Sequence, residues 1–431
     1  MNPRKVAFKV LEKISFSARH LQTTLDEELN RRLGAEERDK AFTTNLLYTV
    51  LRQRLMLEFI LQQVSNYHKL EKKLQLLLLL AAAEMVFLRT PDYAAVNAWV
   101  EISKTSGLKR TSGLVNGILR SLGRLQAWPL LDDSDETGFL STSYSHPRWL
   151  VRAWLDQFGP AATRQWLQAS QQEPLNAIRV NTLKISVSDM HARLQETGLL
   201  VQGHPLSRSS LVLENGVIFG FAEGLWQKQD PGAIAISELL GVRPGSRVLD
   251  MCAGVGGKSG HLAQLMENQG ELLAIEISEG RARAWQKNML RLGVTCARLW
   301  QADAASLSAH EVGLFDYILL DAPCSGLGTT GRRPDIRWRR TEDDLSAMVP
   351  LQRKLLQKAI DLLQPGGILL YATCTTARRE NNGNIEWLLN RHPEIAPTWL
   401  CGAHLHEGFW QTFPEPLQCD GFFAARLQKA A

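Results

Sequence analysis

The sequence lacks closely spaced cysteines. No two of its six cysteines form a C-x-x-C pair, and they are scattered between Cys252 and Cys419. A disulfide framework of the kind found in small secreted domains is therefore excluded, and a reducing, cytoplasmic setting is expected. Cysteines kept in such a setting are either small buried residues or chemically active thiols.

Long hydrophobic stretches are also missing. The longest runs from Leu76 to Ala83 and is bounded by Gln75 and Glu84, so it is far shorter than the roughly 20 residues of a membrane span. We expect it to form a buried helix. The opening residues 1–9 are charged and amphipathic, so no signal peptide is expected there.

Charge of one sign is not in large excess. The chain has 49 Lys and Arg against 44 Asp and Glu, a formal net charge of +5 at pH 7. This small excess permits a nucleic-acid partner without requiring one, so the distribution of charge matters more. With 45% hydrophobic and 22% charged residues, the composition is that of a globular protein and excludes disordered and collagen-like chains. A length of 431 residues, at about 150 per domain, predicts two or three domains.

Residues 1 to about 126 carry the apolar spacing of α-helices, with hydrophobic side chains at i, i+3, i+4 and i+7. Breakers such as Gly34, Pro91 and Gly107 separate the helices, which predicts a helical bundle. The predicted helices are Arg4–Ile14, Leu21–Arg32, Glu36–Phe59, Lys69–Leu88, Tyr93–Lys104 and Lys109–Leu125. The polar, acidic stretch Trp128–Thr142 is predicted to be a linker.

A small α+β module is predicted next. Ser145–Ala169 has the pattern of two helices. Two alternating strands follow, Ala177–Asn181 and Leu211–Phe219, and they flank a predicted helix, Ser186–Thr197.

From about Pro231, short apolar strands alternate with helices, which predicts a mostly parallel, doubly wound α/β sheet. The predicted strands are Arg247–Met251, Leu272–Glu276, Ala297–Gln301, Phe315–Leu320 and Ile368–Thr373, with Gly421–Leu427 as a final antiparallel strand. The predicted domains are residues 1–140, 145–230 and 231–431. Ligands of such sheets bind at the carboxyl ends of the strands, and the unusual residues of this sequence follow those ends.

The first of these strands leads into a glycine-rich loop. The run V-L-D-M-C-A-G-V-G-G-K-S-G, Val248–Gly260, brings Asp250 to a strand end and lets a ligand approach the backbone where a helix begins. The P-loop pattern fails at Cys252, where it needs glycine, and the pattern G-x-G-x-x-G fails at Ser259. The loop favours a nucleoside-bearing cofactor over a tight turn without a ligand.

Acidic residues follow the next two strands. Glu276 lies about 20 residues beyond the loop, where a carboxylate can accept hydrogen bonds from ribose hydroxyls. Asp303 follows the third strand, where a carboxylate could accept from an exocyclic amino group such as that of adenine. A solvated helix cap remains the alternative for Glu276, and an ordinary loop explains Asp303 equally well.

Two thiols complete the predicted site. The fourth strand ends in D-A-P-C, Asp321–Cys324, and the fifth ends at Cys374. Adjacent strands of this fold would place both thiols in one crevice. A lone cysteine is more often a buried hydrophobe than a nucleophile, but two thiols beside a cofactor loop and an aspartate favour chemistry.

An arginine-rich stretch, Gly331–Arg340, lies between the two thiols in the sequence. It interleaves five arginines with a tryptophan, which favours phosphate contact and base stacking over an ordinary solvated surface. The residues predicted to contact nucleic acid are Arg332, Arg333, Arg337, Trp338, Arg339 and Arg340.

Four residues near the C-terminus, Cys401, His404, His406 and Cys419, are of the types that bind zinc. Their spacing, C-x-x-H-x-H with a distant cysteine, matches no common zinc pattern. An ordinary loop is therefore favoured, and no metal is predicted.

Together these motifs resemble the RsmB/NOP family of RNA 5-methylcytosine methyltransferases, and within it the bacterial enzymes for 16S ribosomal RNA. The family patterns D-x-C-A-A-P-G-G-K-T, D-A-P-C-S-G-x-G and T-C are similar to Asp250–Ser259, Asp321–Gly328 and Thr373–Cys374. The resemblance covers essentially the whole chain. The N-terminal helices, with P-D-Y-A-A-V-N-A at Pro91–Ala98, are similar to the RNA-binding NusB family, and A-I-R-V-N at Ala177–Asn181 to a small RNA-recognition-like module.

The resemblance implies a Rossmann-like methyltransferase fold, S-adenosylmethionine as cofactor and 16S ribosomal RNA as substrate, with no membrane or obligate protein partner. It implies that Glu276 holds the ribose, Asp303 the adenine, and Asp321 the methionine amine and the target base. Cys374 would be the nucleophile and Cys324 the thiol that releases the product. The methionine moiety would lie on Ala253, Gly254, Val255, Gly256, Gly257, Lys258 and Ser259. Val255 stands where the family has proline, and Glu276 where aspartate is usual.

The chemistry explains why a thiol is needed. Cytosine C5 is a poor nucleophile, and a thiolate that adds to C6 turns the ring into an enamine with electron density at C5. Nearby arginines and the cationic cofactor would lower the thiol pKa. Two alternatives belong to other classes. One is a DNA cytosine-5 or small-molecule methyltransferase, for which Pro323-Cys324 has the form of the DNA enzymes' nucleophile; the other is an RNA-binding assembly factor with a vestigial catalytic domain.

Overall fold

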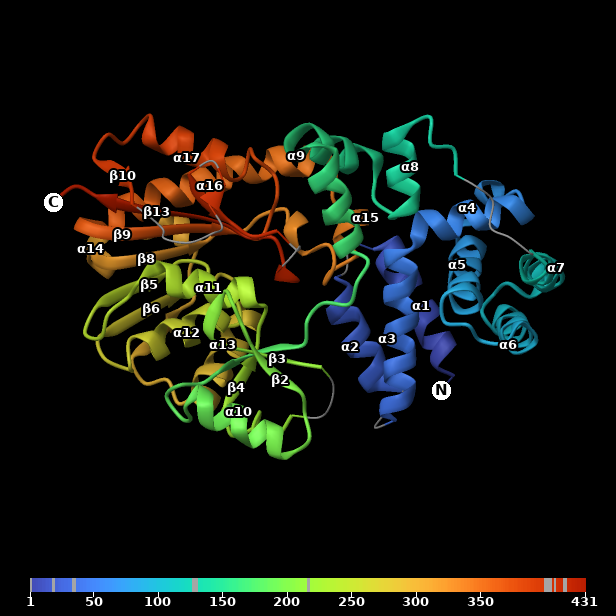
Figure 1. Ribbon diagram of the computed structural model, residues 1–431, viewed down its shortest axis with the longest axis horizontal. Helices are drawn as coiled ribbons and strands as arrows, with labels where there is room; N and C mark the ends of the chain where they lie inside the picture. The colour runs from blue at the N-terminus through green and yellow to red at the C-terminus, as the bar shows by residue number, and fades with distance from the viewer. Residues whose placement is uncertain are drawn as a thin grey trace. The chain divides into compact units, whose positions relative to one another are not determined.

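The computed structural model describes residues 2–17, 20–32, 36–125, 131–214, 218–398, 405–406, 408–413 and 417–431. The chain divides into two compact units, Met1–Gln171 and Gln172–Ala431. In Figure 1 the first unit runs from blue to green and is helical, and the second, from green to red, contains two sheets.

The described residues of the first unit form helices joined by short turns. These are α1 (Pro3–Phe16), α2 (Leu21–Arg32), α3 (Glu37–Arg52), α4 (Arg54–Val64), η1 (Tyr67–Lys69), α5 (Lys72–Val86), α6 (Asp92–Thr105), η2 (Lys109–Thr111), α7 (Ser112–Gly123), α8 (Glu136–Ser143) and α9 (Arg148–Ala169). Every residue of α5 from Leu74 to Met85 is buried, which confirms the predicted buried helix. Its one carboxylate, Glu84, accepts hydrogen bonds from Arg4 and from the indole of Trp99, each at 2.8 Å, so its burial is compensated.

Two sequence predictions in this unit are wrong in part. The single helix predicted for 36–59 is divided between α3 and α4, because Gln53 leaves helical geometry at φ −112°, ψ 17°. The predicted linker contains α8, whose N-cap Asp135 accepts a hydrogen bond from the Gly138 amide at 3.1 Å. The acidic side chain that suggested a linker thus caps a helix. The predicted helical pair at 145–169 is confirmed, since α9 is broken at Gly159 (φ 75°) before Pro160.

The second unit begins with a four-stranded antiparallel sheet and one helix. Its elements are β1 (Ala177–Val180), α10 (Val187–Glu196), β2 (Val201–His204), β3 (Ser207–Leu213) and β4 (Trp226–Lys228). The strand order is β2-β3-β1-β4. Strands β2 and β4 are additions to the sequence prediction. Both are short and carry polar residues, so alternation alone gave little signal for them.

A larger sheet follows, in the order β11-β12-β13-β9-β8-β5-β6-β7, with β10 paired to β13. Its strands are β5 (Arg247–Asp250), β6 (Glu271–Ile275), β7 (Ala297–Trp300), β8 (Phe315–Asp321), β9 (Leu363–Thr373), β10 (Ile395–Pro397), β11 (Leu405–His406), β12 (Phe409–Gln411) and β13 (Phe423–Lys429). Strands β9, β8, β5, β6 and β7 are parallel, and β13 runs antiparallel beside β9. The parallel sheet and its antiparallel last strand are therefore confirmed, while β10, β11 and β12 escaped sequence analysis.

Helices cover both faces of this sheet. They are α11 (Pro231–Leu240), α12 (Gly257–Leu265), α13 (Glu279–Leu292), η3 (Ala304–Ser306), α14 (Ala309–Val312), η4 (Leu327–Thr329), α15 (Ile336–Arg339), α16 (Glu342–Leu362) and α17 (Asn382–Leu389). Val248 of β5 packs into a core with α11 and α12, whereas its neighbour Leu249 packs into a second core with α16 and α17. Burial on both faces explains why the strands are uninterrupted apolar runs. In the central strands β5, β6 and β8 the polar side chains consequently lie toward the strand ends.

Candidate active site

The glycine-rich loop joins β5 to α12 at the carboxyl edge of the large sheet. Gly254 (φ 58°) and Gly256 (φ 88°) adopt left-handed conformations that favour glycine. A Cβ at Gly256 would lie 2.7 Å from Cδ1 of Trp285, so the loop packs closely against α13. The turn places Ala253 to Ser259 at the start of α12, where the first backbone amides have no acceptor within the helix.

Glu276 fastens the end of β6 to this loop. Its Oε2 accepts from the Gly254 amide at 3.0 Å, and its Oε1 accepts from the Ser278 amide at 2.7 Å and from Arg281 at 2.8 Å. The carboxylate, which is only 4% exposed, therefore shapes the loop through both of its oxygens. Asp303 lies at the end of the next strand, is exposed, and caps η3 through the Ala305 amide at 2.9 Å.

Beneath the loop, Asp250 is almost completely buried. One carboxylate oxygen accepts from the Ser259 hydroxyl at 2.6 Å, and that hydroxyl oxygen accepts from the Trp285 indole at 2.9 Å. Burial raises the pKa of Asp250 to about 6, and the negative charge of Asp321 adds to this. The other oxygen, Oδ1, has no hydrogen-bond partner within the described residues.

Lys258 and Asp321 form an ion pair across the site, with Nζ and Oδ2 2.6 Å apart. Burial would lower the pKa of Lys258, but the facing carboxylate of Asp321 outweighs this and raises it, with a further contribution from Cys374. The ammonium group also lies over the ring of Phe422, 5.6 Å from its centroid. A fixed positive charge therefore stands beside Asp321 and near the thiols.

The two thiols predicted from the strand ends are brought together. The Sγ atoms of Cys324 and Cys374 are 3.5 Å apart. The hydrogen bond to Cys374 and burial raise the pKa of Cys324 well above its usual range, which favours the protonated form of this thiol. Either sulfur can donate in the contact between them.

A contact between two glycines holds these strand ends together. The Gly328 amide donates to the carbonyl of Cys374 at 3.0 Å, and the Gly421 amide donates to the carbonyl of Gly328 at 2.8 Å. A Cβ at Gly328 would lie only 1.9 Å from the carbonyl oxygen of Gly421, so no other residue fits. The loop after β8 is thereby clamped between the ends of β9 and β13.

Several side chains of the arginine-rich stretch form ion pairs and hydrogen bonds within the protein. Arg332 bridges Asp230 (2.7 Å) and Asp420 (2.9 Å), which raises its pKa despite burial. Arg337 has no exposed surface and donates to the Thr330 carbonyl at 3.1 Å. The other predicted residues have accessible surface: Arg333 is exposed, and Trp338, Arg339 and Arg340 are half-buried. Arg339 pairs with Asp335 at 3.4 Å and Arg340 donates to the Ser325 carbonyl at 3.0 Å. Sequence spacing could not distinguish these engaged arginines from the exposed Arg333.

A buried carboxylate that sequence analysis did not place in the site, Glu380, hydrogen-bonds the backbone of the residue after Cys324, Ser325, at 2.9 Å. It belongs to a fully buried polar network with Gln352 and Asn384. The signal in the sequence was Arg379-Glu380-Asn381, a few positions after the strand-end Cys374, where the family that the sequence resembles usually has an acidic pair before asparagine.

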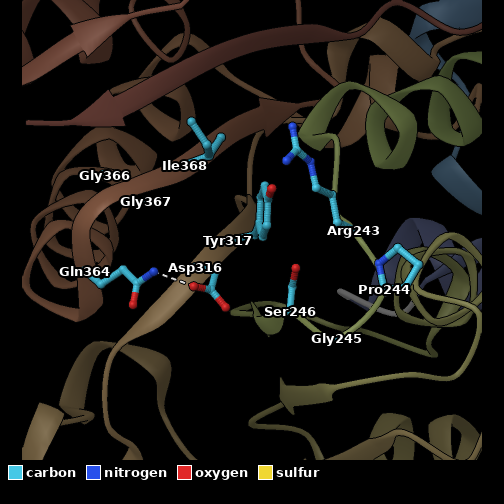
Figure 2. Close-up of a pocket in the computed structure, with 10 residues that line it drawn as sticks. All are labelled: Arg243, Pro244, Gly245, Ser246, Asp316, Tyr317, Gln364, Gly366, Gly367 and Ile368. Carbon is cyan, nitrogen blue, oxygen red and sulfur yellow. Dashed lines mark hydrogen bonds between the residues drawn. The ribbon is translucent and has the colours of Figure 1, made fainter. Parts of the chain in front are cut away.

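A hollow of about 400 Å³ lies away from this site, at the amino ends of the parallel strands. Figure 2 shows it between Arg243–Ser246, Tyr317 and the start of β9. Its carboxylate, Asp316, is already bonded to Gln364 and to the Arg247 amide. Neither the glycine loop nor the thiols line it, so it is not part of the candidate active site.

The four residues considered as zinc ligands are only partly described. Cys401 and His404 lie outside the described residues. Within the described ranges, no three His, Cys, Asp or Glu side chains are grouped so that they could hold a metal ion. In the same ranges no helix has the length and apolar character to cross a membrane.

Comparison with known proteins identifies the family. The model of "16S rRNA methyltransferase RsmB/F" matches residues 237–428, that of the NusB family residues 1–124, and that of a ferredoxin-like domain of RsmF/B-like methyltransferases residues 146–219. A probable ribosomal RNA small subunit methyltransferase B from Synechocystis is 32% identical over 451 residues and all of both chains. The chain belongs to the RsmB/F family of 16S rRNA methyltransferases.

Other members of the RsmB/F family and solved structures agree. Ribosomal RNA small subunit methyltransferase B of Xanthomonas campestris is 32% identical, covering 99% of this chain and 97% of its own. The crystal structure of PH0851 superposes with a TM-score of 0.84 at 26% identity, over 100% of this chain and 99% of that one. The predicted combination of a NusB-like bundle, a small α+β module and an α/β methyltransferase domain is thus confirmed, and the small module is the family's ferredoxin-like domain.

Proposed function

We propose that this protein transfers the methyl group of S-adenosylmethionine to C5 of a cytosine in 16S ribosomal RNA, with Cys374 as the nucleophile. The observation that carries the proposal is the thiol pair, 3.5 Å apart beside the glycine loop and the Lys258–Asp321 ion pair. Membership of the RsmB/F family supplies the substrate class.

The loop has the features that an S-adenosylmethionine site requires. The free amides at the start of α12 suit the methionine carboxylate. The unpaired Oδ1 of buried Asp250 and the carboxylate of Asp321 would be acceptors for the methionine amine. Val255 and Ile277, 51% and 64% exposed, give apolar surface at the rim for a purine ring. Glu276 would hold the ribose and Asp303 the adenine amino group. When bound, the cofactor supplies an electrophilic methyl group.

The protein's own groups would activate the base. Cys374, as thiolate, adds to C6, and the electron pair of the C5–C6 bond becomes available at C5. Lys258 supplies positive charge near Cys374, where a thiolate must form for the addition. Asp321 lies where it can hydrogen-bond the target cytosine and stabilise charge at N3. After methylation a base removes the C5 proton, the C5–C6 double bond re-forms and the Cys374 thiolate leaves. The raised pKa of Cys324 gives this second thiol a proton to exchange at that stage.

RNA recognition would be divided among the proposed domains, residues 1–140, 145–230 and 231–431. The target base must leave its stack, which is easiest in a loop or partly unfolded RNA. Arg333, Arg339 and Arg340 would contact phosphates beside the thiols, and Trp338 would stack on a base. Arg332 and Arg337 would hold the shape of that segment. The N-terminal helices would select the RNA.

The test is methyl transfer from tritium-labelled S-adenosylmethionine to unmodified, protein-free 16S RNA, followed by mapping of the modified nucleotide. We expect 5-methylcytosine in RNA and none in a DNA copy of the same sequence. Labelled DNA would favour a DNA cytosine-5 methyltransferase. Cofactor binding without transfer to either would favour an assembly factor, and absence of cofactor binding by calorimetry would exclude the proposed enzyme.

A further inference from the structure

Glu380 has no exposed surface. Hydrogen bonds to both oxygens of its carboxylate compensate for this burial. Its Oε2 accepts from the Ser325 amide at 2.9 Å and from Nε2 of Gln352 at 2.8 Å. Its Oε1 accepts from the Ser325 hydroxyl at 2.5 Å, and the Thr375 hydroxyl lies 3.4 Å from the same atom. One carboxylate thus gathers groups from three separate segments.

The partners of Glu380 are neighbours of the two thiols. Ser325 follows Cys324, and Thr375 follows Cys374. The hydroxyls of Ser325 and Thr375 are also 2.7 Å apart. Gln352 donates its second hydrogen to the carbonyl of Pro323, the residue before Cys324, at 2.9 Å. The residues next to both thiols are therefore hydrogen-bonded, directly or through Gln352, to the carboxylate of Glu380.

Glu380 is itself held in place. Its carbonyl accepts from the Tyr371 hydroxyl at 2.6 Å and from Nδ2 of Asn384 at 3.0 Å. Asn384 also donates to Oε1 of Gln352 at 2.8 Å, which closes the network. A buried network with every member satisfied has one arrangement that is much lower in free energy than any other, because each broken bond leaves a buried polar group unpaired.

We propose that Glu380 is a positioning residue that fixes the loop carrying Cys324 against the strand end carrying Cys374. It touches neither substrate nor cofactor and acts through Ser325, Thr375 and Gln352. This inference rests on the proposed function for its catalytic consequence, but the arrangement of the thiols can be measured without methyl transfer.

Three variants separate positioning from general stability. Glu380→Ala removes both carboxylate oxygens and so every side-chain acceptor at this position. Glu380→Gln keeps an oxygen for the two N–H donors, and its amide can donate to the Ser325 hydroxyl, so we expect rescue. Glu386→Gln is the matched control, because Glu386 is an exposed carboxylate of α17 that pairs with Arg378 at 3.0 Å. Gln352→Leu, which removes the bond to Pro323, replaces Glu380→Ala if that variant does not fold.

The direct readout uses glutathione disulfide as the oxidant, followed by alkylation and peptide mapping. A thiol attacks glutathione disulfide and releases one glutathione, and the second thiol then displaces the other to form a Cys324–Cys374 disulfide. We expect that disulfide in the wild type, Glu380→Gln and Glu386→Gln. In Glu380→Ala the mixed glutathione disulfide should persist, with the ratio of internal to mixed disulfide at least roughly tenfold lower, since misplacement by about 1 Å has effects of this size.

The kinetic readout combines two measurements, kcat for methyl transfer and the affinity for S-adenosylmethionine. Glu380→Ala should lose roughly tenfold to a hundredfold in kcat with unchanged cofactor affinity. A wild-type disulfide ratio in Glu380→Ala, or equal defects in Glu380→Ala and Glu380→Gln, would overturn the positioning role. The expected disulfide ratios without methyl transfer by the wild-type chain would instead overturn the proposed function and leave the positioning role standing.

Discussion

The Sγ atoms of Cys324 and Cys374 lie 3.5 Å apart at the ends of the neighbouring parallel strands β8 and β9. The hydrogen bond between them and burial raise the pKa of Cys324, which favours its protonated form. The proposed function gives the two sulfurs different roles. The difference gives opposite expectations for two variants that each remove one sulfur.

Cys374→Ala should abolish methyl transfer and yield no covalent RNA adduct, because the nucleophile is gone. Cys324→Ala should still add to C6 and methylate, but release of the product should fail, so a protein–RNA species should survive denaturing gel electrophoresis. The measurement is a gel of both variants with 16S RNA and S-adenosylmethionine. A stable adduct from Cys374→Ala, with none from Cys324→Ala, would reverse the two roles and match the Pro-Cys nucleophile of DNA enzymes.

Glu276→Ala and Asp303→Ala should each weaken S-adenosylmethionine binding by about 1–3 kcal/mol, through lost hydrogen bonds to ribose and adenine. We expect the larger loss for Glu276, because its carboxylate also holds the Gly254 amide of the loop at 3.0 Å. Isothermal calorimetry measures both affinities. Unchanged binding in both variants would show that these carboxylates do not contact the cofactor.

Arg332 and Arg333 are adjacent in sequence but should behave differently. Arg332→Ala leaves Asp230 and Asp420 buried without their cation, so we expect a loss of about 3–5 kcal/mol in unfolding free energy. Arg333→Ala should leave stability unchanged but weaken RNA binding and reduce the slope of log K against log[salt] by about 1. Urea denaturation and RNA binding at several salt concentrations test the pair, and an exchange of the two phenotypes would contradict the assignment.

Asp250 should make the protein less stable as pH rises through the mildly acidic range. Burial raises its pKa to about 6 in the folded chain, whereas an unfolded Asp titrates near 3.9. The folded state therefore binds this proton more tightly, and the contribution of Asp250 to the unfolding free energy falls by about 2–3 kcal/mol between about pH 4 and 6. Asp250→Asn should remove this slope, while Asp343→Asn, at an exposed position, should keep it. Urea denaturation across that range gives the result, and equal slopes in all three chains would contradict it.

The N-terminal unit should serve RNA selection rather than chemistry. A truncated chain that begins at Gln172, where the second compact unit starts, should still bind S-adenosylmethionine but lose affinity for 16S RNA. Calorimetry and RNA gel shifts compare it with the full chain. Retention of full RNA affinity would assign the first unit a structural role only.

The periodicity of hydrophobic residues predicted most helices and strands, because the burial pattern of those elements is regular. The strands β5, β6 and β8 are apolar runs buried on both faces, and α5 is apolar all round. The break at Gln53 escaped detection because no proline or glycine marks it. Strands β11 and β12 are two and three residues long; β11 pairs with β12 and β12 pairs with β13, and no local pattern reveals such pairing.

At the candidate active site, too, features with a local sequence pattern were predicted and contacts between distant residues were not. Spacing along strands predicted that Cys324 and Cys374 would share a crevice, and their Sγ atoms are indeed close, 3.5 Å apart. The engagement of Arg332 by Asp230 and Asp420 was not predictable, because these three residues are far apart in the sequence. Glu380 was missed for a related reason. Its partners Ser325 and Gln352 meet it only in the folded chain, and a buried carboxylate looks like any other acidic residue when neighbours in space are unknown.

The close approach of Gly328 to Gly421 bears on the order in which the enzyme becomes reactive. The cofactor loop is assembled from β5, α12 and β6, which are near one another along the chain. The clamp behind the thiols needs the segment before β13 to dock, and contacts between such distant segments form late in folding. A newly made chain should therefore acquire its cofactor cradle first. Incompletely folded molecules would then carry no assembled thiol pair, so an activated nucleophile arises only in a finished domain.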